Sequence, residues 1–126
     1  MPTQVLISGS RAVIEVYEDA RGRLPPWEFI QELPDSEFRK AGTRLKIIAE
    51  LGLPSGEHKI KKIQANLFEI KSDQVRLLCY LRPHRVPATL VLLTAFKKKS
   101  PKLPKREIRR AEGILQEILG QGRMIT

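Results

Sequence analysis

The sequence predicts an α+β fold in which an antiparallel sheet of about four to five strands carries two N-terminal helices, arranged as a helical hairpin, and a C-terminal helix. Apolar residues alternate with a period of two near the N-terminus, and residues 59–96 contain β-rich segments separated by short polar or Pro-containing breaks, as strands and their connections do. Between these stretches, and after Pro104, apolar residues recur every three or four positions, as they do in amphipathic helices. Helices grouped on one face of such a sheet would leave the other face open for chemistry.

The first elements are a strand and two helices. Residues 11–17, "RAVIEVY", alternate between two faces as a strand does. Pro25 and Pro26 suit a helix entrance, and the following "WEFIQEL" places its apolar residues on one side of a short helix. Asp35 or Ser36 would cap a second helix, whose apolar stripe continues to "LGLPSG". Because so few residues separate the two helices, we expect them to form a hairpin.

The next segments read as a meander, with "KIKKIQ", "LFEIK", "QVRLLCYLR" and "ATLVLLTAF" as strands. A turn at residues 72–73 would set Lys71 opposite Gln74 and Glu69 opposite Arg76. Glu69 and Arg76 would then share the open face with Tyr80, while Cys79 would lie on the face against the helices. The final helix opens at Pro104, and its apolar stripe is Ile108, Ala111, Leu115 and Ile118.

Composition limits the possible partners. With 126 residues, of which 41% are hydrophobic, the chain is expected to form one domain over residues 1–126. Residues 1–56 hold 7 basic and 8 acidic side chains, whereas residues 57–126 hold 16 and 6, so the net charge of +9 belongs to the second half. Clustered cations suit a polyanion such as nucleic acid, and the alternative is a solvated basic face.

A single cysteine and two distant histidines offer no zinc spacing, so we expect no metal and no cofactor. The sequence contains no membrane span, and its start lacks the order of a signal peptide. These features predict a cytoplasmic protein without a membrane partner.

Three stretches occur in the order of motifs from a known superfamily: "LPPWEFIQELP", "HKIKKIQANLFEIKSDQVRLLCYL" and "LLTAFKKKSPKLPKREIRRA". Together they resemble the RelE/ParE toxin superfamily, and within it the HigB-type, phage-related branch. The resemblance covers roughly residues 12–115, and the last stretch is the most specific. It implies a RelE-like fold and the toxin of a bacterial or phage type II toxin–antitoxin pair.

The resemblance also implies an activity and partners. Members of this branch are endoribonucleases that cut messenger RNA, typically in the decoding site of the ribosome beside 16S rRNA. A helix-turn-helix antitoxin encoded adjacently silences them. Two alternatives stay open: a ParE-like toxin that inhibits gyrase and cuts nothing, and a non-catalytic RNA-binding relative.

Metal-free RNA cleavage requires a general base for the 2′-hydroxyl, cations for the developing charge and an acid for the leaving oxygen. The candidate catalytic residues are Arg76, Lys98, Lys71, Tyr80 and Glu69. Arg76 and Lys98 match the site cations of the family, and Lys71 stands where the family has an arginine. Arg76 has a planar guanidinium suited to phosphate, and its structural alternative is an ion pair with Glu69.

The general base is open, because the C-terminal segment lacks the tyrosine or histidine of many superfamily ribonucleases. Tyr80, Glu69 and His58 are the candidates, and Tyr80 is also expected to stack on a base unless it is an ordinary half-buried sheet residue. Further cations are expected to follow the RNA backbone or to hold phosphate at the start of the last helix. They are Lys59, Lys61, Lys62, Lys97, Lys99, Lys102, Lys105, Arg106, Arg109 and Arg110.

Overall fold

The structure is a computed structural model that describes residues 2–53 and 60–121. Its three helices and six strands follow the amphipathic and alternating patterns of the sequence. In chain order the elements are β1 (Thr3–Ser8), β2 (Ala12–Tyr17), α1 (Pro25–Gln31), α2 (Asp35–Leu51), β3 (Ile60–Gln64), β4 (Leu67–Ser72), β5 (Val75–Leu81), β6 (Ala88–Lys97) and α3 (Lys105–Gln121). None of the helices in the described part of the chain has the length and apolar character to span a bilayer.

The predicted fold class is wrong in its sheet and in the place of its helices. The six strands form one mixed sheet in the order β1-β2-β6-β5-β4-β3. Every neighbouring pair is antiparallel except β2 and β6, which run parallel. Two strands, and not the single predicted one, precede α1 and α2, so these helices follow a β-hairpin. Local periodicity reveals strands, but the parallel pairing of two strands so far apart in sequence depends on tertiary contacts.

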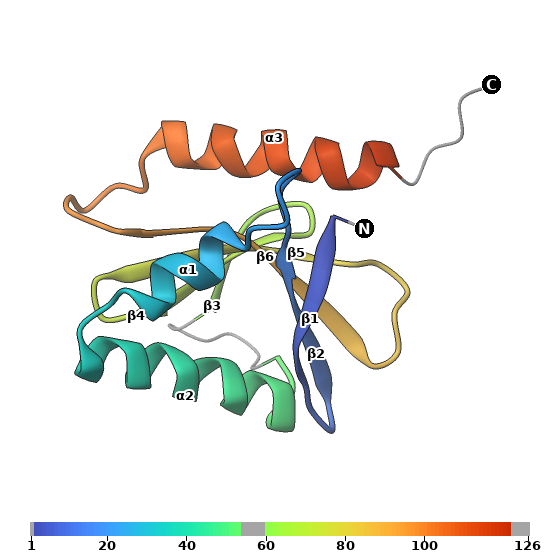
Figure 1. Ribbon diagram of the computed structural model, residues 1–126, viewed down its shortest axis with the longest axis horizontal. Helices are drawn as coiled ribbons and strands as arrows, with labels where there is room; N and C mark the ends of the chain where they lie inside the picture. Colours follow the sequence, from blue (N-terminus) through green and yellow to red (C-terminus); the bar gives the residue numbers. More distant parts are fainter. Residues whose placement is uncertain (1, 54–59, 122–126) are drawn as a thin grey trace.

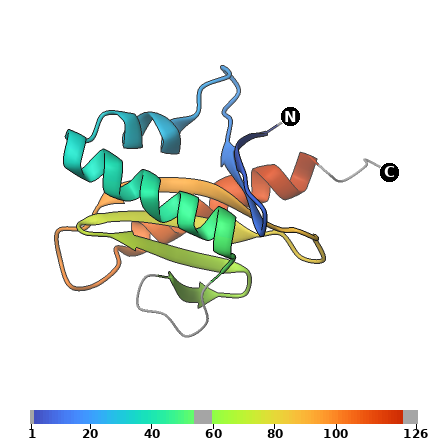
Figure 2. The ribbon, with the colours of Figure 1, turned by 90° about the horizontal axis from the view of Figure 1, so that it is seen from below.

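Helices cover both faces of the sheet, so the expected open face is largely closed. Figures 1 and 2 show α1 and α2 on one side of the sheet and α3 on the other. The larger core layer joins Leu45 and Ile48 of α2 to Leu77 of β5, and the smaller one joins Ala111 of α3 to Leu78 of β5. The apolar stripe of α3 requires this cover, because an amphipathic helix is stabilised by burying its apolar side.

Gly9 in the turn between β1 and β2 packs directly on α2. A Cβ atom at Gly9 would collide with the backbone of Ala49, and the Arg11 amide donates a 2.9 Å hydrogen bond to the Ala49 carbonyl. Only glycine permits this close approach of turn and helix. β1 itself escapes sequence analysis because it is an edge strand whose residues are only partly buried, without a clean alternation.

The β4–β5 hairpin is shifted from its predicted register. The observed turn residues are Asp73 and Gln74, so Lys71 lies opposite Arg76 and Glu69 lies opposite Leu78. Asp73 has a φ of 54°, a left-handed conformation that a two-residue hairpin turn requires and that aspartate tolerates. Because the register moves by an even number of positions, each side chain stays on its predicted face of the sheet.

Tyr17 ties β2 to α3. Its hydroxyl donates to the carboxylate of Glu117, with the oxygens 3.0 and 3.1 Å away. Burial, this hydrogen bond and the negative charge of Glu117 raise the pKa of Tyr17 from 10.0 to about 12. The protonated phenol therefore stabilises the attachment of α3.

This arrangement predicts an alkaline stability loss that depends on Tyr17. The unfolded phenol releases its proton near pH 10 and the folded one near pH 12, so between these values the unfolded state binds fewer protons. The free energy of unfolding should therefore fall across this window. Urea titrations of wild type and Tyr17→Phe between pH 8 and pH 12 check this. The variant should have a lower free energy of unfolding at pH 8, and this free energy should decrease less toward pH 12. If the free energy of unfolding fell equally with pH in both proteins, the loss would not come from Tyr17.

Candidate nucleic-acid interface

A groove on the α3 side of the sheet gathers five of the candidate lysines. Strands β3 and β4 form one wall and the connection from β6 to α3 forms the other, enclosing about 470 Å³. We call it the lysine groove. Its lining residues are Lys61, Lys62, Ile63, Glu69, Lys71, Lys98, Pro101, Lys102 and Leu103.

Strand pairing explains how lysines distant in sequence meet. Lys61 lies directly opposite Glu69 in the β3–β4 ladder, so both are presented on neighbouring strands. Lys98 follows β6, and its amide donates a 2.8 Å hydrogen bond to the carbonyl of Gln74 in the β4–β5 turn. This bond fixes the point where the chain leaves the sheet and crosses the groove. Lys102 then lies on the far wall.

Glu69 is the single carboxylate among the residues that line the lysine groove. The residue is 2% exposed, and its Oε2 atom lies 3.6 Å from Nε of Arg76. Neither of these two atoms has a hydrogen-bond partner among the described residues. A buried carboxylate needs a nearby cation to remain charged, and Arg76 supplies it from the neighbouring strand.

Arg76 does not line the groove, contrary to its predicted place as an open phosphate grip. Its side chain is only 12% exposed. Its Nη1 atom donates to the carbonyl oxygens of Asp73 and Val75, at 3.0 Å for Val75, and so closes the β4–β5 turn. The structural alternative, an ion pair with Glu69, is the observed arrangement, though diagonal across the ladder because of the shifted register.

Tyr80 is also displaced from its expected role. It is 6% exposed and packs with Leu67 and Ala111 beneath α3, so no RNA base can stack on its ring. The prediction assumed an open sheet face, which α3 fills instead. Cys79 faces the opposite core layer as expected, where burial raises the pKa of its thiol.

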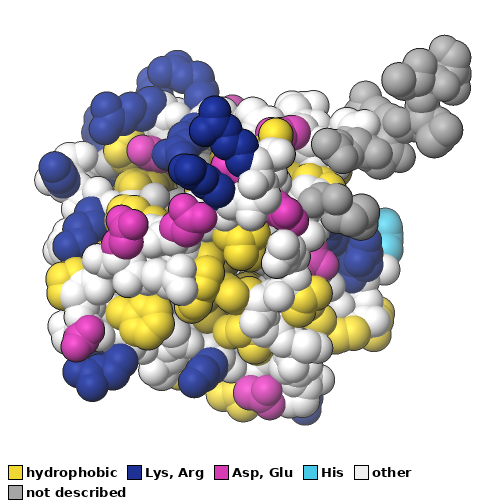
Figure 3. Space-filling view, viewed as in Figure 1, with side chains coloured by type: hydrophobic (Ala, Val, Ile, Leu, Met, Phe, Trp, Pro, Cys, Tyr) yellow, Lys and Arg dark blue, Asp and Glu magenta, His cyan; other side chains and the backbone are white. Residues whose placement is uncertain are grey.

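The remaining cations divide between ion pairs and open surface. Lys97 points to the other side of the sheet and pairs with Glu37 of α2 at 3.1 Å, whereas Lys98 faces the groove, as strand alternation predicts. Lys99 is exposed, and Figure 3 shows Lys and Arg side chains gathered over α3 and the loop before it. The exposed cations of α3 are Lys105, Arg106, Arg109 and Arg110. Lys59 and His58 lie outside the described residues.

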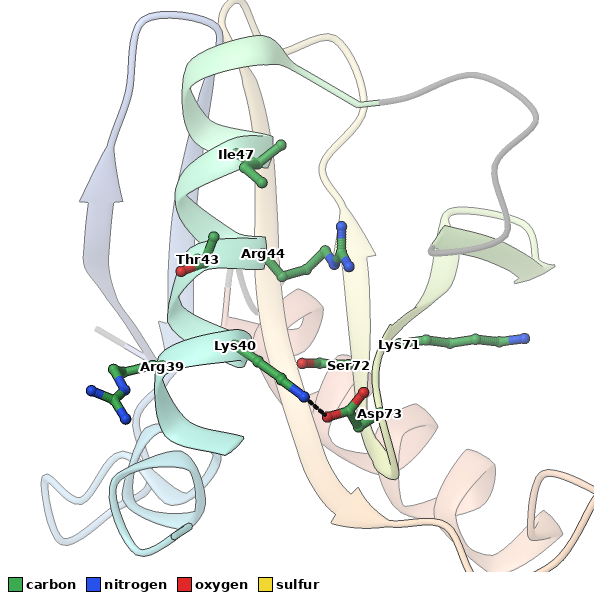
Figure 4. Close-up of a pocket in the computed structure, with 8 residues that line it drawn as sticks. All are labelled: Arg39, Lys40, Thr43, Arg44, Ile47, Lys71, Ser72 and Asp73. Atoms are coloured by element: carbon green, nitrogen blue, oxygen red, sulfur yellow. Dashed lines mark hydrogen bonds and ion pairs between the residues drawn. The ribbon is translucent and has the colours of Figure 1, made fainter. Parts of the chain in front are cut away.

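Sequence reasoning missed a second basic site, between α2 and the β4–β5 turn. Figure 4 shows Lys40 extending from α2 to this turn, where it pairs with Asp73 at 2.9 Å, and Arg44 extending from the next helical turn toward the sheet. The buried Nε of Arg44 has no partner among the described residues. The spacing of Lys40 and Arg44, one helical turn apart, is the signal that would have indicated a shared face. Lys71 lies between this site and the lysine groove, because it contributes to both.

The charges of the lysine groove define its chemistry. Five lysines and a single carboxylate line the groove, so its excess of positive charge attracts polyanions. Lysine ammonium groups donate hydrogen bonds to phosphate oxygens, whereas an ionised carboxylate accepts a proton. The groove thus combines phosphate-holding cations with one potential base.

Comparison with known proteins identifies the family. Residues 28–116 match the family described as phage derived protein Gp49-like (DUF891), and this segment contains the whole lysine groove. No curated protein matches the sequence. The Gp49-like family is related to the RelE/HigB-type toxins of toxin–antitoxin systems, whose members have antitoxin partners. Since the match covers more than half of its length, the chain belongs to the phage-derived Gp49-like family.

Proposed function

We propose that the protein is the toxin of a type II toxin–antitoxin pair and a metal-independent endoribonuclease that cuts messenger RNA on the ribosome, in the cytoplasm. The observation that carries the proposal is the buried Glu69 carboxylate in a groove lined by five lysines. Membership of a family related to RelE-type toxins supports the same conclusion. The RNA substrate is held through its phosphates, because the groove offers cations and few apolar side chains.

The proposed reaction is an intramolecular transesterification. Glu69, which is only 2% exposed at the wall of the groove, takes the proton of a ribose 2′-hydroxyl through one intervening water molecule, and the 2′-oxygen attacks the adjacent phosphorus. The phosphorus–5′-oxygen bond breaks, and a lysine of the groove gives a proton to the leaving oxygen. The products are a 2′,3′-cyclic phosphate and a 5′-hydroxyl, and water restores the proton of the lysine and removes that of Glu69.

Lys98 and Lys71 have the best positions to stabilise the transition state. Both are only partly exposed, and both line the groove together with Glu69. Ammonium groups held near the phosphate stabilise the negative charge that gathers on its oxygens. Arg76 acts as a positioning residue, because it holds Glu69 and the β4–β5 turn without lining the groove.

Mapping of RNA ends after expression in bacteria tests this function. We expect new 5′-hydroxyl ends inside translated messages, together with growth arrest and with intact DNA. The catalytically impaired Glu69→Gln chain, expressed at the same level, is the matched control. Intact RNA accompanied by gyrase-dependent DNA damage would instead support the ParE-like alternative.

Charge removal in the groove should weaken RNA binding in a salt-dependent manner. Replacing Lys71, Lys98 and Lys102 together by Gln removes three phosphate contacts. The slope of log affinity against log salt is negative, and for single-stranded RNA its magnitude should decrease by about 2 in this variant. Fluorescence anisotropy with a labelled 12-nucleotide RNA measures this slope.

The matched control removes three exposed cations elsewhere, with Arg21, Arg23 and Lys46 replaced by Gln. This variant has the same net charge as the groove variant, but its cations lie outside the lysine groove. We expect its salt slope to stay near the wild-type value. Equal effects of the two triple variants would show that RNA follows net charge alone, and would contradict the groove as its binding site.

A further inference from the structure

A second groove, on the side of the sheet opposite to the lysine groove, is predominantly apolar. It encloses about 490 Å³ between β1, α1 and α2. Leu6 and Ile7 of β1, Trp27 of α1 and Phe38 and Leu45 of α2 contribute its apolar surface. The rings of Trp27 and Phe38 meet at a centroid distance of 6.0 Å, which fixes one end as a rigid aromatic wall. We call this site the apolar groove.

Gly42 makes the hollow. It lies in the middle of α2 and lines the apolar groove, and a Cβ atom built on it would meet no atom within 4 Å. Glycine within a helix is destabilising relative to alanine. Neither a close approach nor a positive φ accounts for it, in contrast to Gly9 and Gly52. Gly113 and Gly120 of α3 are equally open, so the glycine by itself indicates no ligand; its contribution is that the missing side chain deepens the apolar groove.

Two cations border the apolar groove. Arg39 and Lys46, about two turns apart on α2, line it, and neither forms an ion pair with any described residue. Figure 4 shows Arg39 directed to the other side of α2 from Lys40 and Arg44. An apolar floor with a cationic border is complementary to an amphipathic segment that has apolar residues on one side and acidic residues at its edges.

We propose that the apolar groove docks the neutralising antitoxin through a short amphipathic helix with acidic edges. This rests on the proposed function, in which the chain is a toxin with such a partner. Apolar side chains of that helix fill the hollow above Gly42 and contact Trp27 and Phe38, while its carboxylates pair with Arg39 and Lys46. RNA is excluded as the main occupant, because bases and phosphates would leave the apolar floor without matching contacts.

The location separates docking from the RNA site. The apolar groove lies among α1, α2 and β1, whereas the lysine groove lies beside the start of α3, on the other side of the sheet (Figures 1 and 2). The docked helix therefore leaves Glu69 and the lysines uncovered. Neutralisation at this site acts by keeping the complex off the ribosome, so the complex should still bind a short free RNA.

Filling the hollow tests the proposal with a matched pair of variants. Gly42→Leu places a large side chain in the groove, whereas Gly42→Ala adds one methyl group and leaves most of the hollow open. Gly42→Ala should raise Tm or leave it unchanged, because it replaces a helical glycine and its Cβ atom meets nothing within 4 Å; the Tm of Gly42→Leu is measured beside it to confirm that this variant is folded. The probe is the purified helix-turn-helix protein encoded beside this chain, titrated by calorimetry against each full-length protein.

We expect Gly42→Leu to lose affinity for this probe on the order of 30-fold or more, as removal of a hot-spot contact does. Gly42→Ala should bind within a few fold of wild type. Lys46→Glu should weaken binding more than Lys46→Gln, and the difference should shrink as salt is added. All four variants should bind the labelled RNA as wild type does, since none of them alters the lysine groove.

Unchanged affinity of Gly42→Leu for the probe would overturn the proposal. The proposal would also be overturned if the wild-type protein were a dimer and Gly42→Leu made it monomeric without lowering its affinity for the probe. In that case the groove would hold a second copy of the chain. The binding assay needs no toxicity, so its outcome is independent of RNA cleavage. A wild-type protein that binds the probe through this groove but cuts no message would refute only the proposed enzymatic function.

Discussion

Glu69→Gln is expected to lower the rate of RNA cleavage by about 10²–10⁴-fold while RNA affinity stays equal or increases. The amide keeps the volume of the carboxylate but cannot accept the proton of the 2′-hydroxyl. Removing the one negative charge from a groove lined by five lysines also makes the groove more attractive to phosphate. Single-turnover cleavage of a message on programmed ribosomes gives the rate, and anisotropy gives the affinity.

Glu107→Gln provides the matched control. Glu107 likewise has a cationic neighbour, because it lies 4.0 Å from Arg110 on α3, and its side chain is 14% exposed, but it does not line the lysine groove. We expect this variant to cleave as wild type does. A Glu69→Gln protein that retains wild-type cleavage would remove Glu69 as the base.

Arg76→Ala should destabilise the fold by about 3–5 kcal/mol, because it leaves the buried Glu69 carboxylate without its cation. It also removes the donor for the carbonyl groups of Asp73 and Val75 in the β4–β5 turn. The sequence favours Arg76 as a phosphate-binding residue, a role whose loss would harm activity more than stability. The ion pair reverses that expectation, and urea unfolding monitored by circular dichroism measures the change.

The double variant Glu69→Gln/Arg76→Ala separates the charge from the turn contacts. With no carboxylate left to compensate, part of the lost stability should return, which gives a favourable coupling energy between positions 69 and 76. A single Arg76→Ala variant with wild-type stability but no cleavage would indicate that the guanidinium binds substrate directly. Arg76→Lys keeps the positive charge near Glu69 and should be less destabilising than Arg76→Ala.

Glu69→Gln and Arg76→Ala should impair the protein in different ways, and this difference distinguishes the role of Glu69 from that of Arg76. Glu69→Gln should impair chemistry and cost less stability than Arg76→Ala, since Arg76 keeps its hydrogen bonds to the carbonyl groups of Asp73 and Val75. Arg76→Ala should impair stability first and activity through it. The relation follows from geometry: Glu69 lines the groove, whereas Arg76 does not line it and contacts Glu69 from the neighbouring strand.

Local patterns determined most of the secondary structure and much of the site. The helical stripe of α2 is buried at Ala41, Leu45 and Ile48 as its periodicity predicts, and α3 begins directly after Pro104. Such patterns are local, because the side that a helix or strand buries is set by spacing along the chain. The clustering of lysines in the second half likewise predicted a polyanion site, and five of the candidates meet in one groove.

Pairings between distant segments were decided only by tertiary structure. The edge strand β1, the parallel contact of β2 with β6 and the cover of α3 over Tyr80 all join residues that no local pattern connects. The same holds for the β4–β5 register, where a left-handed Asp73 shifted every cross-strand partner without changing a face. Sequence therefore determined which residue types were available for chemistry. Long-range packing decided that Glu69 lines the groove, whereas Arg76 and Tyr80 have structural roles. The reason is that the burial of a residue depends on which other parts of the chain pack against it.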